Sequence, residues 1–214
     1  MRRNTLLSTI AASAVAVVML AGTPASGQVG QGLVDFNTAT AEQLAALPHV
    51  TPVAVKAVTD GKPFMSIVDL HKTLLAAGLT ADQTTELYRK AFVHVNLNTG
   101  TPEEILLIPG AGRRMAREFG EYRPWVSWVQ FDKEISKYVG LDETNRLKQY
   151  VFIPVDLNTA TDEDILSIPG AGRRMVREFK EYRPWTSQVQ FEKEIGKYVD
   201  AKEVARLWRY VVIK

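Results

Sequence analysis

Apolar residues recur at helical spacing along most of the chain after residue 33. Met115, Phe119 and Tyr122 follow one another at intervals of four and three residues, which places them on one face of a helix. The same kind of spacing continues through Phe131, Ile135, Tyr138, Leu147 and Tyr150. The pattern therefore predicts an all-α fold built from short helices.

Start and stop signals divide this pattern into helices. Thr101-Pro102-Glu103-Glu104 combines an N-cap, a proline at the first helical position and a glutamate that closes a capping box. The helix that follows must stop at a proline and two glycines, in the stretch Ile108-Pro109-Gly110-Ala111-Gly112-Arg113-Arg114-Met115. The stretch predicts two helices joined by a tight hairpin, with bare backbone amides at its tip. It recurs unchanged from Ile168 to Met175.

Internal repetition sets the domain organisation. The stretch from Val155 to Ile213 aligns without a gap to that from Val95 to Ile153, and Val34 to Val93 is a third, diverged copy. We predict repeats over residues 34–94, 95–154 and 155–214, each of about four short helices. Short apolar connectors join them, namely Phe92-Val93, Val151-Phe152-Ile153 and Val211-Val212-Ile213.

The N-terminus is typical of a secretory signal. Arg2 and Arg3 precede an apolar core from Leu6 to Leu20, and small residues follow up to Gly27. We expect a signal peptide over residues 1–27 and a linker over 28–33. Once the signal is removed, we expect a periplasmic or extracellular protein without a membrane span. The alternative is that the segment stays uncleaved as a membrane anchor. Without Arg2 and Arg3, the 26 Lys and Arg residues fall to 24, which equals the 24 Asp and Glu. A nucleic-acid surface would therefore need its basic groups sorted onto one face.

Three motifs carry a resemblance to a known family: Leu157-Asn158-Thr159-Ala160-Thr161, Ile168-Pro169-Gly170-Ala171-Gly172 and Glu181-Tyr182-Arg183. Together they resemble the helix-hairpin-helix domain of ComEA-type competence proteins, which are exported or membrane-anchored and bind incoming double-stranded DNA. The resemblance implies three tandem helix-hairpin-helix units that contact DNA phosphates through hairpin amides and adjacent arginines. The implied DNA-binding residues are Gly110, Ala111, Gly112, Arg113, Arg114, Gly170, Ala171, Gly172, Arg173 and Arg174.

The first repeat departs from this pattern, because Pro48-His49-Val50-Thr51-Pro52 has neither glycine. It also resembles the 12 kDa extrinsic protein of photosystem II, which uses the same fold to dock onto proteins. We therefore expect an exported protein that binds double-stranded DNA without sequence preference, for DNA capture or uptake. The first repeat would be a structural cap or would dock a protein partner. The alternative is a structural or protein-docking module of the cell envelope that does not bind DNA.

Several residues have a structural alternative. Glu118 and Glu121 stand at helical pairing distance from Arg114 and Arg117, so these charges could neutralise one another. Trp125 and Trp185 precede helix starts, which favours core packing over base stacking. The spacing of the three histidines does not suit a metal site, and no nucleophile motif or acid–base pair stands out. We expect no enzyme activity, no metal and no cofactor.

Overall fold

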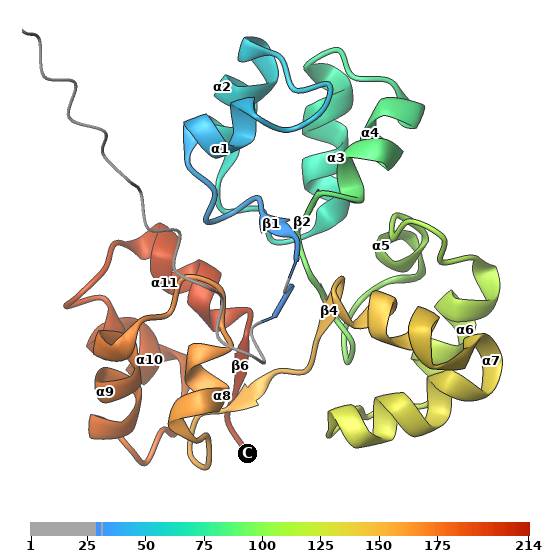
Figure 1. Ribbon diagram of the computed structural model, residues 1–214. Coiled ribbons are helices and arrows are strands. Elements are labelled where there is room, and N and C mark those ends of the chain that lie inside the picture. The colour runs from blue at the N-terminus through green and yellow to red at the C-terminus, as the bar shows by residue number, and fades with distance from the viewer. Residues whose placement is uncertain (1–28, 31) are drawn as a thin grey trace, which may run out of the picture.

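The computed structural model describes residues 29–30 and 32–214. The predicted signal peptide and the linker positions Gln28 and Gln31 lie outside these residues. The described part is mostly helical, with eleven helices and six strands of two residues each, and Figure 1 shows three groups of helices around the short strands. Its helices include none that is long and apolar enough to cross a membrane.

We call the three groups the first, second and third segments. The first contains β1 (Val34–Asp35), α1 (Ala41–Ala45), α2 (Pro52–Gly61), α3 (Ile67–Ala76), α4 (Ala81–Tyr88) and β2 (Ala91–Phe92). The second contains β3 (Val95–Asn96), α5 (Pro102–Leu106), α6 (Arg113–Glu121), α7 (Trp128–Lys148) and β4 (Val151–Phe152). The third contains β5 (Val155–Asp156), α8 (Asp162–Leu166), α9 (Arg173–Glu181), α10 (Gln188–Ile195), α11 (Ala201–Trp208) and β6 (Val211–Val212). Gly140, at φ 77°, interrupts α7, so α7 covers the two helices expected there.

The stretches predicted as connectors pair with the start of their own segment. β1 pairs in parallel with β2, β3 with β4, and β5 with β6. Val95 lies opposite Val151, and Val155 opposite Val211. The predicted connectors are therefore extended and paired: each segment is closed by a short parallel ladder, and backbone groups bond where the two ends meet.

An asparagine holds each segment together across 27 residues of sequence. Asn98 Nδ2 donates to the Trp125 carbonyl (2.9 Å), and the Trp125 amide donates to Asn98 Oδ1 (2.6 Å). Asn158 and Trp185 repeat this pair at 3.0 and 2.7 Å, and Asn37 does the same with Phe64. Trp125 and Trp185 are each 1 % exposed, which confirms that they pack in the core.

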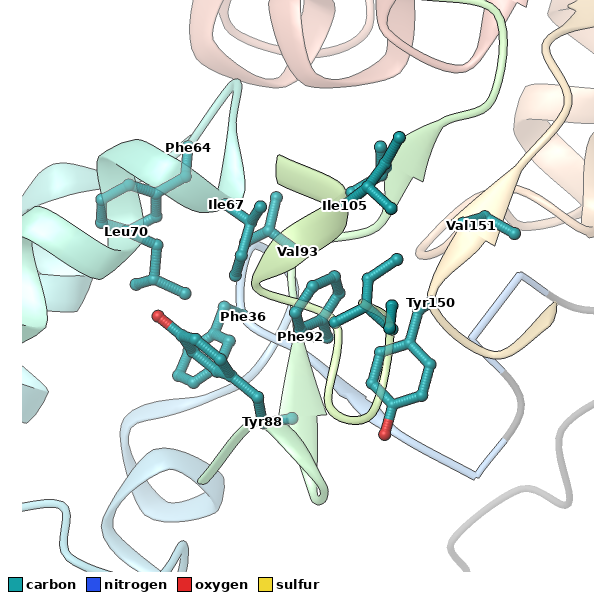
Figure 2. Close-up of a cluster of buried hydrophobic side chains, with 14 of the residues drawn as sticks. Phe36, Phe64, Ile67, Leu70, Tyr88, Phe92, Val93, Ile105, Tyr150 and Val151 are labelled. Atoms are coloured by element: carbon teal, nitrogen blue, oxygen red, sulfur yellow. The ribbon is translucent and has the colours of Figure 1, made fainter. Parts of the chain in front are cut away.

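Aromatic side chains join neighbouring segments. Phe92, at the end of the first segment, packs edge-on against Tyr150 of the second, with ring centroids 5.0 Å apart (Figure 2). Phe152 packs against Tyr210 of the third segment in a tilted arrangement, with ring centroids 4.5 Å apart. The first two segments share one continuous core, and Phe152 belongs to the core of the third. The predicted repeats therefore do not pack as independent domains.

A buried polar cluster joins the third segment back to the first. His94 Nδ1 lies 3.0 Å from Asp35 Oδ2, and the Tyr210 hydroxyl donates to the same oxygen at 3.4 Å. Arg209 donates from Nη2 to the His94 carbonyl at 2.8 Å. Burial raises the pKa of Asp35, but His94, Arg206 and Arg209 lower it more, so the net shift is downward and the carboxylate stays ionised. The first and third segments thus meet at one charged centre.

Candidate nucleic-acid interface

The predicted hairpin joins α5 to α6 in the second segment and α8 to α9 in the third. Gly110 has φ 82° and Gly170 has φ 76°, a conformation that side chains other than glycine rarely adopt. Gly112 and Gly172 have extended backbones, at φ −97° and −105°. A Cβ at Gly112 or Gly172 would meet nothing within 4 Å, so these two positions face open space.

The two helices that follow these hairpins start without a side-chain cap. Nine of the eleven described helices have an N-cap side chain that accepts a hydrogen bond from a backbone amide. In α6 and α9 the N-cap is Gly112 or Gly172, and no such bond exists. The amides of Gly112, Arg113 and Arg114 find no acceptor among the described residues. A helix start of this kind offers free N–H groups and a positive dipole end to an anion.

Ala111 and Ala171, also predicted to bind phosphate, take a structural role at the hairpin centre. The Ala111 amide donates to the Ile108 carbonyl at 2.9 Å, and the Ala171 amide donates to Ile168 at 3.0 Å. The Ala111 side chain is buried. These two amides are engaged within the hairpin, so the available donors lie at the glycines and at the arginines that follow.

The four predicted arginines are exposed and make no ion pair within the described residues. Arg114 lies over the ring of Tyr138, with Cζ 4.6 Å from the ring centroid. Arg174 lies over Tyr198 at 5.0 Å. The pairing alternative holds instead for Arg117, which contacts Glu118 at 3.0 Å and Glu121 at 3.7 Å. The first two arginines of each hairpin therefore keep their charge available to an anion.

The tyrosine below each arginine is held by a second tyrosine. The hydroxyls of Tyr122 and Tyr138 lie 2.8 Å apart, and those of Tyr182 and Tyr198 are separated by the same distance. The hydrogen bond to Tyr122 raises the pKa of Tyr138, with burial adding to the shift, so this hydroxyl stays protonated. The pair gives each arginine a fixed, neutral aromatic surface, which is an arrangement suited to a cation–π contact.

Two arginines that lie behind the hairpins were not predicted from the sequence. A Cβ at Gly110 would meet Nη2 of Arg146 at 3.0 Å, and at Gly170 it would meet Nη2 of Arg206 at the same distance. Arg206 also donates from Nη1 to the Pro169 carbonyl at 2.6 Å. Arg146 and Arg206 occupy the same position when the second and third repeats are aligned, and this shared position is the sequence signal that identifies them. Each is held by a glutamate one turn earlier, Glu143 or Glu203.

The first segment keeps the hairpin but has fewer free amides. His49 takes the left-handed conformation at φ 63°, where the other hairpins have glycine. Its Nε2 lies 2.6 Å from Oε2 of Glu86, which stands where the other segments have Arg146 and Arg206. The N-cap Thr51 accepts a hydrogen bond from the Ala54 amide, and Pro52 has no N–H to offer. This hairpin therefore presents a capped helix start and a carboxylate where the other two present an uncapped helix start and an arginine.

A basic hollow adjoins the third hairpin. It has a volume of about 690 Å³ and lies along α8 and α9, lined by Asp162, Leu166, Arg173, Val176, Arg177, Lys180 and Glu181. Three of these side chains are cationic and two are acidic.

No group of three potential metal ligands occurs in the part of the chain that the structure describes.

Comparisons with protein-family models, with curated proteins and with solved structures each found no match to this chain.

Proposed function

We propose that the chain is an exported protein of three tandem helix-hairpin-helix units, of which the second and third bind duplex DNA through its phosphates. The observation that carries this proposal is the pair of uncapped helix starts at Gly112 and Gly172, in a fold where the other helices are capped by side chains. Phosphate oxygens are acceptors that suit such amides. Contacts to phosphates set affinity and not sequence choice, so binding is non-specific.

The exposed arginines add charge at the same place. Arg113 and Arg114 follow the free amides of the second hairpin directly, and Arg173 and Arg174 follow those of the third. If each hairpin neutralises about two phosphates, the slope of log affinity against log salt is about −3 to −4. Such binding is modest and easily reversed by salt, which suits capture or uptake of DNA at the cell envelope. The N-terminal pattern of charged, apolar and small residues supports export.

The first unit would have a structural or partner-docking role. Its hairpin presents Glu86 beside His49, and a carboxylate at this position repels a phosphate. The rival function, a docking module that binds no DNA at all, would extend this behaviour to all three units.

The experiment that tests the proposal is titration of labelled duplex DNA at low salt, read by fluorescence anisotropy. The test variant is Gly112→Asp with Gly172→Asp. Both positions have extended backbone and open space around the new Cβ, and aspartate is a good N-cap, so the free energy of unfolding should stay within about 0.5 kcal/mol or rise. The new carboxylate occupies the amides and repels phosphate. DNA affinity should therefore fall by roughly tenfold or more while the fold is retained.

The matched control is Gly112→Ala with Gly172→Ala, which adds a Cβ without a charge or a capping oxygen. It should keep DNA affinity within a few-fold of the wild type. If folded wild-type protein does not bind duplex DNA, or if the aspartate variant binds as well as the alanine variant, the proposed function is wrong and the docking alternative is favoured.

A further inference from the structure

The three segments surround a groove that is separate from the hairpins. It has a volume of about 860 Å³ and receives residues from α3, from the start of α5, and from the end of α11 with β6. The first turns of α3 place one helical face in it, since Val68, Asp69 and Lys72 follow at intervals of one and three residues, and Met65 lines it from just before the helix. The groove therefore exists only where all three segments meet.

A second hollow continues on the other side of two apolar side chains. It has a volume of about 450 Å³ and lies along α10 and α11. Met65 of the first segment and Trp208 of the third line both hollows. Met65 is 47 % exposed, and Trp208 is held in place by Phe191, with ring centroids 5.2 Å apart. A methionine beside a fixed aromatic ring is an adaptable contact surface for an apolar side chain.

The two hollows together have a surplus of negative charge. Five carboxylates line them, namely Asp69, Glu103, Glu104, Glu192 and Asp200. The cations are Lys72 and Arg209. Arg209 is already engaged, because it donates to the His94 carbonyl and its charge acts on the buried Asp35. Three of the carboxylates also accept hydrogen bonds within the protein, namely Glu104, Glu192 and Asp200. Asp69 and Glu103 remain beside Lys72, so the surface available to a ligand is acidic and adjoins the apolar side chains of Met65 and Trp208.

This charge excludes duplex DNA and favours a ligand of opposite sign. We propose that the groove binds a basic segment of a partner protein, with lysines or arginines facing the carboxylates and an apolar side chain against Met65 and Trp208. The proposal does not rest on DNA binding, because it involves none of the hairpin residues. It gives the first segment, through α3, a direct part in docking.

The test uses the full chain and a labelled synthetic peptide in which lysines flank a central pair of leucines. Two matched peptides accompany it, one with glutamate in place of lysine and one with serine in place of leucine. Fluorescence anisotropy should show binding of the lysine–leucine peptide that weakens with salt. Binding of the other two should be weaker by roughly tenfold or more, because each lacks one of the two features of the groove.

Variants then locate the site. Asp69→Lys with Glu103→Lys should reduce affinity for the lysine–leucine peptide by roughly tenfold or more. The control is Asp82→Lys with Glu163→Lys, which makes the same charge change in the first turns of α4 and α8, away from both hollows. Because the net charge changes equally in both variants, the peptide affinity of the control should stay within about twofold of the wild type.

A third variant, Met65→Ser, removes the apolar contact at an exposed position and should also weaken binding several-fold while leaving the circular dichroism spectrum unchanged. No binding of the lysine–leucine peptide by the wild type would overturn the proposal. So would equal losses in the groove and control variants, or unchanged binding by Met65→Ser.

Discussion

Replacement of Asn158 by alanine should destabilise the protein more than any comparable change at an exposed asparagine. The Asn158 carboxamide makes two hydrogen bonds to one residue, donating to the Trp185 carbonyl and accepting from the Trp185 amide. Trp185 itself is 1 % exposed and packs against Phe191 and Tyr182. The pair therefore fixes the chain just before α10 to the strand region at the start of the segment.

The magnitude follows from the number of bonds. Each hydrogen bond contributes about 1 kcal/mol net, and each partly buried backbone group left without a partner costs about 1–3 kcal/mol. Solvent reaches Asn158 in part, so water can satisfy some of this loss. We expect Asn158→Ala to lower the free energy of unfolding by about 2–4 kcal/mol. For a chain of this length, about 3 kcal/mol corresponds to a fall in Tm of roughly 6–12 °C.

Thermal unfolding followed by circular dichroism measures this shift. Asn145→Ala is the control, because Asn145 is exposed on α7 and makes no side-chain hydrogen bond among the described residues; its effect should stay within about 0.5 kcal/mol. Asn158→Asp keeps the acceptor for the Trp185 amide but sets a charged oxygen against the Trp185 carbonyl, so it should also lower Tm. If Asn158→Ala melts within about 2 °C of the Asn145 control, the reasoning that the asparagine fixes the segment is refuted.

Two further predictions concern the tyrosines and the buried cluster. Tyr138→Leu with Tyr198→Leu should weaken DNA affinity several-fold in the anisotropy assay, because a cation–π contact contributes about 0.5–1 kcal/mol at an exposed site. The control, Tyr138→Phe with Tyr198→Phe, keeps both rings and should bind DNA within about twofold of the wild type. Equal losses of affinity in the leucine and phenylalanine variants would contradict the stacking argument. The pKa of Asp35 is lowered below 3.8 in the folded state, so its stabilising effect is present above that value and is lost as pH falls through the folded pKa. In urea unfolding, the free energy of unfolding of the wild type should therefore decrease as the pH falls through the acid range. Asp35→Asn should be less stable at neutral pH and should lose less stability in acid. Parallel plots of unfolding free energy against pH for the two proteins would contradict this prediction.

Local features of the structure could be predicted from the sequence because they depend on neighbouring residues. Thr40, Thr101 and Thr161 begin helices through the capping boxes that their spacing indicates. Trp125 and Trp185 are buried where their position before a helix start places them. The capping bonds span three residues, and each tryptophan packs against aromatic rings six residues away, so the local pattern contains these physical causes.

Features that depend on distant residues were missed. The pairing of Val95 with Val151 joins positions 56 residues apart through strands of only two residues, which have no detectable period. The two hydrogen bonds of Asn98 likewise reach a residue 27 positions away, so the neighbouring sequence does not indicate its structural role. Arg206 lies behind the hairpin because of the way α11 packs against it, and the spacing of apolar residues along a helix does not specify this packing.

The free amides and the charges of the hairpins vary together among the three segments. Thr51 in the first segment caps α2 and Pro52 removes an N–H, so fewer amides remain there for an anion, and Glu86 adds a negative charge. Gly112 and Gly172 forgo a side-chain cap and are each followed by two exposed arginines. A helix start without a cap is less stable than one with serine, threonine or aspartate, so its presence only beside free cations suggests a ligand that completes it. The charges of the chain, which nearly balance at a formal net charge of +2, are thus sorted into basic hairpins and an acidic groove, and each surface favours a partner of opposite charge.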